Sequence, residues 1–297
     1  MLSCLPSLNK APDFVLKGGT AINLFLRSDY PRISVDIDLT YLPIQDRAQS
    51  LQGIESGLKI IGAAIKHDHP KVLIKENYSR KNKVVSRLDV SLNNTSIKVE
   101  PNFILRGSVF APSKMNVSPK VAATYNASPI GINVASLADV YAGKICAALD
   151  RQHPRDLFDV KLLLEDTGIT QDIKNAFLIY LSSHNRPMHE LLEPHLLDQR
   201  AVFDVEFKGM ENMAVSYDAL IKARLDLILA LKKALADDDK EFLVSVSRGS
   251  PNWSKMPLGN LEKLPSIQWK LINIGIMDKD KQNLMIDNLT RVLSNYG

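Results

Sequence analysis

The sequence predicts an α+β fold in which a mixed sheet flanked by helices precedes a mainly helical lobe. Two observations support this class. Up to residue 104, short apolar runs typical of strands are mixed with apolar residues at helical spacing. From residue 136 onward long helical patterns dominate, and residues 111–133, which are rich in Pro, Ser, Asn and Gly, separate the two parts. We therefore expect two domains, residues 1–127 and 128–297.

In the first part, each element follows from a local pattern. The expected strands share apolar and β-branched residues and cover residues 14–17 (a strand or a helix end), 33–39, 71–75, 84–92 and 96–104. Residues 20–26 and 47–67 place apolar side chains at helical spacing. The turn Asn93-Asn94-Thr95 suits positive φ, so the last two strands are expected to form an antiparallel hairpin.

In the second part, helix start and stop signals are clear. Ser136 is a good N-cap for a helix over residues 137–149. Pro154 fits the first turn of the next helix, which runs to residue 165 and is followed by Gly168. Further helical patterns cover residues 218–236, 269–274 and 282–293.

The composition is that of a globular protein with a sizeable core. Of 297 residues, 45% are hydrophobic and 24% charged, and the net charge of +4 does not by itself indicate a nucleic-acid partner. Cys4 and Cys146 form neither a zinc-binding nor a disulfide pattern. Because no stretch approaches the roughly 20 apolar residues of a membrane span and no signal sequence is visible, we expect a cytoplasmic protein without membrane contact.

Two aspartates stand inside the apolar run of residues 33–39. Asp36 and Asp38 are two apart, so on a strand they share one face, about 6–7 Å apart, while Ile37 points the other way. Two such carboxylates repel each other, and a hard divalent cation such as Mg²⁺ relieves this repulsion. The alternative is a half-exposed edge strand with solvated aspartates.

The preceding segment Gly18-Gly19-Thr20 makes the alternative of a solvated edge strand less favoured. Glycines allow positive φ and a close approach to a ligand, and the free N–H groups where a helix opens favour a phosphate. Alone, these residues fit an ordinary tight turn. Neither the P-loop pattern nor GxGxxG is present. A phosphate-binding turn joined by one helix to an acid pair is the combination that indicates a nucleotide site.

These ordered motifs, Lys17-Gly18-Gly19-Thr20 and Arg32-x-Ser34-x-Asp36-Ile37-Asp38-Leu39, resemble the polymerase-β-like nucleotidyltransferase superfamily. Within it the chain is similar to the AbiEii/AbiGii toxin family of abortive-infection and toxin–antitoxin systems, over residues 14–161 with an echo at 264–273. The resemblance implies a nucleotidyltransferase core and a helical domain that completes the active-site cleft. It also implies an NTP substrate, Mg²⁺ and a cognate antitoxin. The usual Gly-Ser is Gly19-Thr20 here, which keeps the hydroxyl.

The superfamily completes its metal site with a third carboxylate from a neighbouring strand. Two candidates lie on the predicted hairpin, Glu100 and Asp89. We favour Glu100, because Pro101 follows it and ends regular pairing. The alternative for either acid is a solvent-facing carboxylate that pairs with Lys98 or Arg87 across the hairpin.

A later segment carries charged residues on one helix face. Lys144, Ala148 and Arg151 fall at i, i+4 and i+7, and Asp159 follows Arg155 by four residues. By resemblance, Lys144 and Arg151 would bind the nucleotide and Asp159 would support the active site, with Arg155 and Asp156 orienting their neighbours. The alternative is a solvated face with weak salt bridges.

The acceptor is inferred from charge and from the resemblance. Residues 66–106 hold nine Lys and Arg against four acids, a local excess of five positive charges. The basic residues that we expect to contact nucleic acid are Lys71, Lys75, Arg80, Lys81, Lys83 and Arg87. Some members of the family add nucleotides to tRNA 3′ ends and so block translation, and we expect a tRNA acceptor here. A protein-nucleotidylating (AMPylating) enzyme and a non-catalytic nucleotide-binding scaffold remain alternatives, and so does a merely solvated hairpin face.

Overall fold

The chain forms two compact units in the computed structural model, which describes residues 1–81, 83–127, 129 and 131–296. Met1–Ser136 combines a sheet with helices, and Leu137–Gly297 is mainly helical, which confirms the predicted α+β class. The predicted boundary at 127/128 lies before this division. The reason is β7 (Ile132–Val134), which pairs with β1 and β6 and so belongs to the sheet.

Among the described residues of the first unit, seven strands form one mixed sheet in the order β3-β4-β5-β2-β1-β7-β6. Their bounds are β1 Phe14–Lys17, β2 Asp36–Tyr41, β3 Leu73–Tyr78, β4 Val85–Leu92, β5 Thr95–Pro101, β6 Ser113–Met115 and β7 Ile132–Val134. The pairs β2–β5 and β1–β7 are parallel, and the other neighbours are antiparallel. The acid-bearing strand β2 therefore lies in the middle of the sheet.

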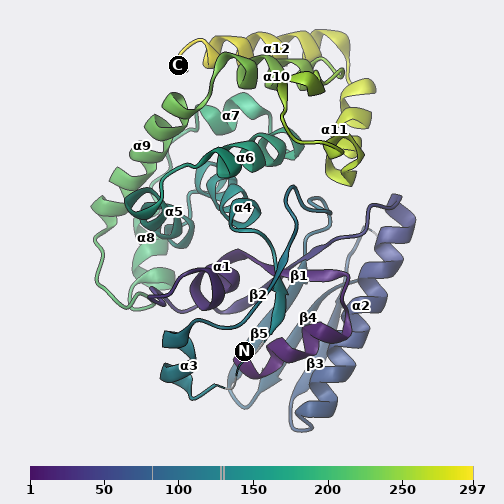
Figure 1. Ribbon diagram of the computed structural model, residues 1–297, viewed down its shortest axis with the longest axis vertical. Helices are drawn as coiled ribbons and strands as arrows, with labels where there is room; N and C mark the ends of the chain where they lie inside the picture. Colours follow the sequence, from purple (N-terminus) through teal and green to yellow (C-terminus); the bar gives the residue numbers. More distant parts are fainter. Residues whose placement is uncertain (82, 128, 130, 297) are drawn as a thin grey trace. The chain divides into compact units, whose positions relative to one another are not determined.

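The helices of the first unit are η1 (Leu2–Lys10), α1 (Gly18–Ala21), which continues as a π-helical turn to Leu26, α2 (Arg47–Asp68) and α3 (Pro119–Tyr125). Helix α2 runs along β3 and β4 (Figure 1). Asp46 caps it by accepting a hydrogen bond from the backbone N–H of Gln49. Where it crosses β4, Gly62 leaves room for Leu88, so α2 covers the apolar face of these strands.

Alternation along β2 sorts its side chains as the sequence predicts. Ile37 and Leu39 are fully buried, whereas Asp36 and Asp38 project from the opposite face and are partly exposed. The strand begins at Asp36 rather than at residue 33, and Ile33 stays 44% exposed. The predicted hairpin is confirmed, with Asn93 at φ 52° in the turn between β4 and β5.

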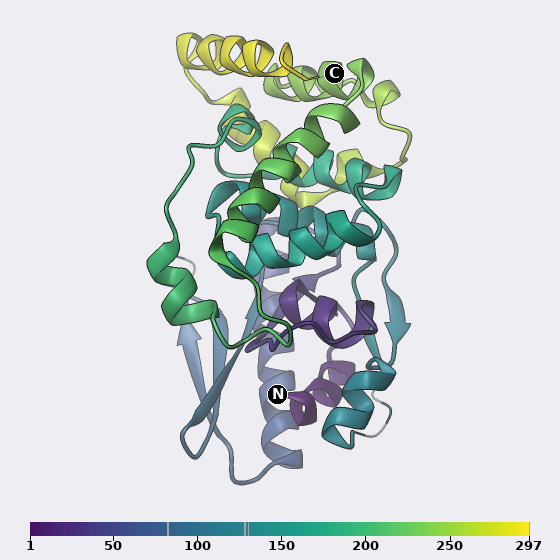
Figure 2. The ribbon, with the colours of Figure 1, turned by 90° about the vertical axis from the view of Figure 1, so that its left-hand side faces the viewer.

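The second unit consists of α4 (Leu137–Asp150), α5 (Pro154–Asp166), α6 (Gln171–Ser183), α7 (Met188–Leu192), α8 (Arg200–Val202), α9 (Tyr217–Ala234), α10 (Asp237–Ser247), α11 (Pro265–Gly275) and α12 (Lys279–Leu293), with short helical turns between them. Helices α4 and α5 pack against α6 and α9 around buried side chains such as Ile145, Phe177 and Leu227 (Figure 2). Within the described residues, none of the helices has the length and apolar character required to cross a bilayer.

Candidate active site

The turn after β1 places Gly18 against the carboxylate of Asp38, one of the two aspartates of β2. Lys17, the last residue of β1, lies opposite Asp38 in the antiparallel pairing of β1 with β2. Gly18 follows with φ +70°, and a side chain at Gly18 would overlap the carboxylate of Asp38. Only glycine combines this backbone conformation with this close approach. The two predicted motifs therefore meet directly in space.

The next two residues tie the turn to the segment that leads into β2. Thr20 is fully buried, and its hydroxyl lies within hydrogen-bond distance of Oγ of Ser34, at 2.8 Å, and of the backbone carbonyl of Asp36. The hydroxyl is therefore engaged inside the protein, and the groups of this turn that suit a phosphate are its backbone N–H groups.

Sequence reasoning missed the role of Arg32. Its side chain is among the largest fully buried ones, and a methyl group at Gly19 would lie 2.6 Å from its Nη2. Gly19 is thus required for contact with a buried guanidinium, in addition to any contact with a ligand. The signal was present in the sequence, since Arg32 and Ser34 alternate with the acids in the same motif.

Three carboxylates lie on one face of neighbouring strands. In the parallel pairing of β2 with β5, Asp38 lies beside Glu100 and Asp36 beside Lys98. Burial raises the pKa of Glu100; the charge of Arg87 acts in the opposite direction, and Asp38 and Asp36 raise the pKa further. These acids therefore repel one another, as expected of groups that share a cation.

Of the two candidates for the third carboxylate, the register favours Glu100. Asp89 lies one strand further from Asp38, opposite Lys98. It accepts a hydrogen bond from Nδ2 of Asn77 at 2.9 Å, and Nε of Arg87 is 2.7 Å from its Oδ1. Asp89 is thus held in place by partners, whereas the contact that the described residues give to Glu100 is a longer one, 3.6 Å to Arg87.

The donor set suits Mg²⁺. Asp36, Asp38 and Glu100 offer carboxylate oxygens from one face of the sheet, the ligand type that this ion prefers. Among the described residues, no three acidic, His or Cys side chains converge into a ready-made metal site. Magnesium is usually held by one or two carboxylates together with water and substrate phosphate, so an acid pair beside a phosphate-binding turn fits it.

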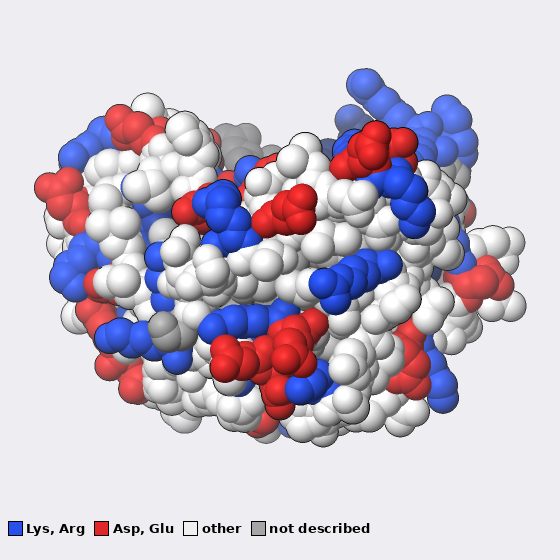
Figure 3. All heavy atoms as spheres, turned by 90° about the horizontal axis from the view of Figure 1, so that it is seen from above, with Lys and Arg blue, Asp and Glu red and all other residues white. Residues whose placement is uncertain are grey.

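The predicted basic residues divide into two groups. Five are exposed: Lys71 in the turn before β3, Lys75 on β3, and Arg80, Lys81 and Lys83 in the turn that follows it. Lys75 lies opposite Asp89 and so points to the face that carries Asp36, Asp38 and Glu100. Arg87, by contrast, is half-buried and paired with Asp89, and it acts on the acids rather than standing free for nucleic acid. On the face drawn in Figure 3, by comparison, basic and acidic residues are interspersed.

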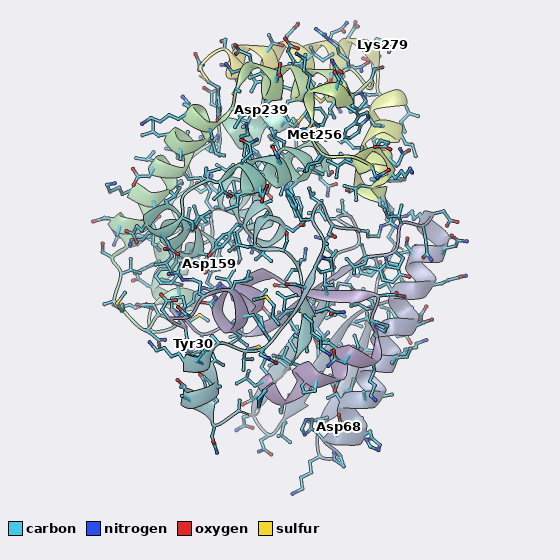
Figure 4. All side chains as sticks on the ribbon, viewed as in Figure 1. Tyr30, Asp68, Asp159, Asp239, Met256 and Lys279 are labelled. Atoms are coloured by element: carbon cyan, nitrogen blue, oxygen red, sulfur yellow. The ribbon has the colours of Figure 1, made fainter. Side chains whose placement is uncertain are left out.

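In the second unit, Lys144 and Asp159 belong to a buried ion cluster, which the exposed Arg151 joins from the surface. Nζ of Lys144 lies 2.8 Å from Asp156 and 3.0 Å from Asp159, both completely buried, and Nε of Arg151 donates to Asp156 at 2.7 Å. Figure 4 shows Asp159, which lies on α5. Burial alone would raise the pKa of Asp156, but the charges of Lys144 and Arg151 outweigh it and hold the pKa well below its usual range.

Both the sequence and the fold are similar to those of known nucleotidyltransferase toxins. A family model for the nucleotidyl transferase AbiEii toxin of type IV toxin–antitoxin systems matches residues 1–272. The fold is similar to MenT4, a nucleotidyltransferase toxin from Mycobacterium tuberculosis H37Rv, with a TM-score of 0.58 and 14% identity over 98% of this chain and 90% of that one. JHP933 from Helicobacter pylori matches with a TM-score of 0.42 and 18% identity, over 77% of this chain and 85% of that one. Among curated proteins there is no significant match.

Proposed function

Because the chain belongs to the AbiEii family of nucleotidyltransferase toxins from type IV toxin–antitoxin systems, we propose that it transfers a nucleoside monophosphate to the 3′ end of a tRNA and so blocks translation. The family establishes a nucleotidyltransferase that uses an NTP and has an antitoxin partner. The acceptor, the metal and the roles of individual residues are the proposal.

In this proposal the turn after β1 binds the phosphates of the NTP, and the acids of β2 and β5 bind the metal ion. The backbone N–H groups of Gly18, Gly19 and Thr20 bind the β- and γ-phosphates, because they lie where a helix opens. Asp36, Asp38 and Glu100 would hold Mg²⁺, and the bound ion would supply charge neutralisation at the triphosphate and a lower pKa for the attacking hydroxyl. Gly18 keeps the Asp38 carboxylate in contact with the turn, so phosphate and acids are brought to one place.

The chemical step needs no protein nucleophile. The oxygen of the RNA 3′ hydroxyl forms a bond to the α-phosphorus, the bond between this phosphorus and the pyrophosphate oxygen breaks, and the hydroxyl proton leaves to solvent. Lys144, Arg151 and Asp159 serve the same reaction in this proposal, with Lys144 and Arg151 assisting the nucleotide. This role is proposed from the resemblance of their sequence motif to that of the family. Because Nζ of Lys144 already contacts Asp156, a phosphate would have to compete with Asp156 for this lysine.

The acceptor is proposed to be RNA because of the exposed basic residues on β3 and its turn. Lys75 shares a sheet face with the acids, and Arg80, Lys81 and Lys83 follow within a few residues. Such exposed cations suit a phosphate backbone, whose binding releases counterions. The contact between Gly18 and Asp38 is the observation that carries the enzymatic part of the proposal.

The test is labelling of total RNA and total protein with each of four α-³²P NTPs, in the presence of Mg²⁺ or EDTA. We expect one NTP to label tRNA in the presence of Mg²⁺, and Asp38→Asn to abolish the label. Label that enters protein alone would favour the protein-nucleotidylating alternative. No incorporation with any NTP, together with undiminished NTP binding, would favour the non-catalytic scaffold.

Growth arrest gives an independent readout in cells. Expression of the wild type should stop growth, and expression of Asp38→Ala at the same level should not. Equal toxicity of the two proteins, or equal harmlessness, would remove support for toxicity by catalysis.

A further inference from the structure

A lysine that the candidate active site does not use lies on the sheet face of the acids. Lys98 of β5 is exposed and lies beside Asp36 of β2 in the parallel pairing of these strands. The hairpin pattern of the sequence allows Lys98 to pair with Asp89 or Glu100. In the structure both of these acids contact Arg87 instead, and among the described residues no ion pair or hydrogen bond involves the ammonium group of Lys98. This cation is therefore open to a ligand.

The strand register makes Lys98 part of a row of alternating charges across four strands. Asp36 of β2 lies beside Lys98, which lies opposite Asp89 of β4. Asp89 in turn lies opposite Lys75 of β3, the edge strand of the sheet. Residues that are paired in this way share a face, so all four side chains project from the face of the acids. The row leads from the edge of the sheet to the candidate metal site.

The acid inside this row does not neutralise its two lysines. Nε of Arg87 lies 2.7 Å from Oδ1 of Asp89, and Nδ2 of Asn77 donates to Oδ2 of Asp89 at 2.9 Å. Lys75 is exposed, and within the part of the chain that the structure describes its ammonium group takes part in no ion pair or hydrogen bond. Lys75 and Lys98 thus stand on either side of a carboxylate that other residues already hold.

The spacing of the row suits the backbone of a single nucleic-acid strand. Neighbouring strands lie about 4.8 Å apart, so the backbone of Lys98 is about 5 Å from that of Asp36 and about 10 Å from that of Lys75. Stacked nucleotides advance about 3.4 Å each, so the two lysines match phosphates about three nucleotides apart. A lysine ammonium binds phosphate as a point charge, which does not require the fixed geometry of a bidentate contact.

The place of Lys98 relative to the glycine turn favours the acceptor over the NTP as its ligand. In the sheet, β1 and β5 flank β2 on opposite sides. Gly18, where the triphosphate is expected, follows β1, whereas Lys98 belongs to β5. Because the attacking and leaving oxygens of a phosphoryl transfer are roughly in line, the acceptor has to approach the acids from the side away from the pyrophosphate. Lys98 lies on that side.

We propose that Lys98 and Lys75 bind phosphates of the acceptor RNA, whose 3′-terminal strand crosses the sheet from β3 to β2. Lys98 binds the phosphate of the terminal nucleotide, so that the 3′ hydroxyl of this nucleotide reaches the acids. The charge of Lys98 also offsets the repulsion between this phosphate and the nearby carboxylates. This inference rests on the proposed function for RNA as the acceptor, and it adds a residue and a direction to it.

Binding and transfer by the full chain test the two lysines. The variants are Lys98→Gln and Lys75→Gln, and the matched control is Lys114→Gln, which removes an exposed lysine of β6 at the opposite edge of the sheet. We expect each site variant to bind total tRNA roughly tenfold more weakly, to raise the KM for tRNA by a similar factor, and to reduce the magnitude of the slope of log K against log salt concentration by about 0.7. The KM for the NTP and the Tm should equal those of the wild type and of Lys114→Gln.

Three results would overturn the proposal. Unchanged tRNA binding by Lys98→Gln would remove the contact. A higher KM for the NTP in Lys98→Gln would assign this lysine to the nucleotide. An equal loss of tRNA binding in Lys114→Gln would show a general effect of charge and no defined path across the sheet.

A modified RNA tests the direction of the strand. Replacing the phosphate of the terminal nucleotide of a tRNA by an uncharged methylphosphonate should weaken binding to the wild type by about the same factor as Lys98→Gln does, and Lys98→Gln should bind both RNAs equally. Equal sensitivity of the wild type and the variant to this modification would refute the contact. Binding is measured without NTP, so a failure of the proposed function stays distinct. A wild type that binds RNA at Lys98 but transfers no nucleotide would refute the transfer and support the contact, and a wild type that binds no RNA would refute both.

Discussion

Replacing Lys144 by methionine should destabilise the second unit strongly, because it removes a positive charge that lies between two buried carboxylates. Lys144 is 9% exposed, and its Nζ contacts Asp156 and Asp159, which are fully buried. Methionine fills a similar volume without charge. Asp156 keeps its contact with Arg151, but Asp159 loses the positive charge that the described contacts give it.

The expected loss follows from breaking a buried ion pair on one side, which costs about 3–5 kcal/mol. For a unit of roughly 160 residues, each kcal/mol corresponds to about 2–4 °C in Tm, so Tm should fall by about 6–20 °C. The stability of the unit should also depend on acidity. The pKa of Asp156 is depressed in the folded state, so its stabilisation is present above the unfolded pKa and is lost as pH falls below about 4. In Lys144→Met this acid-induced loss should be smaller.

Thermal unfolding of the full chain at several pH values measures both effects, with Lys161→Met as the control. Lys161 pairs with Glu165 on the surface of α5, so its replacement should cost at most about 0.5 kcal/mol. Adding Asp156→Asn and Asp159→Asn to Lys144→Met should recover part of the loss, since the two buried negative charges are then removed together with the lysine. If Lys144→Met melts within 1–2 °C of the control, as rough bounds from the same scaling, the cluster does not stabilise this unit.

Three further predictions concern the first unit. Gly18→Ala should lower the free energy of unfolding by about 1–2 kcal/mol through left-handed strain, and it should lower labelling activity about 100-fold or more because the methyl group displaces Asp38. The control Gly168→Ala, at φ +67° with open space around it, should lose stability but not activity. Asp38→Asn should lower labelling about 100-fold or more while leaving Tm equal or higher, since one member of a group of repelling charges is removed; a drop in Tm would contradict this. Glu100→Gln should reduce kcat more than Asp89→Asn does, and the reverse order would assign the third carboxylate to Asp89.

The extent to which the sequence predicts this fold depends on how local each signal is. The period-2 pattern of β2 and the helical pattern of α2 were read correctly because their buried residues repeat along the chain. The strands β6 and β7 were missed. Each has three residues, within a segment whose Pro, Ser and Asn content resembles a linker. Their stability comes from pairing, as between Val134 and Leu16, which are far apart in sequence.

The candidate site shows the same limit. Asp36 and Asp38 could be found from alternation alone, and the glycines from their place before a helix. That Glu100 lies beside Asp38 depends on the register of β2 with β5, which joins strands more than 50 residues apart and cannot be read from either. The buried positions of Thr20 and Lys144 were likewise hidden, because a hydroxyl or an ammonium gives no sign in the sequence of the partner that it will meet.

The two faces of β2 separate stability from chemistry within six residues. Ile37 and Leu39 are fully buried in the core, and the acids on the other face contribute repulsion instead of packing. A strand can carry such a cost because its apolar face supplies roughly 1.5–3 kcal/mol for each large buried side chain. In the proposed function a bound cation would relieve this repulsion, which is expected of residues kept for a ligand and not for the fold. We therefore expect that a variant in which the acids of this face are made neutral folds more stably but does not transfer a nucleotide.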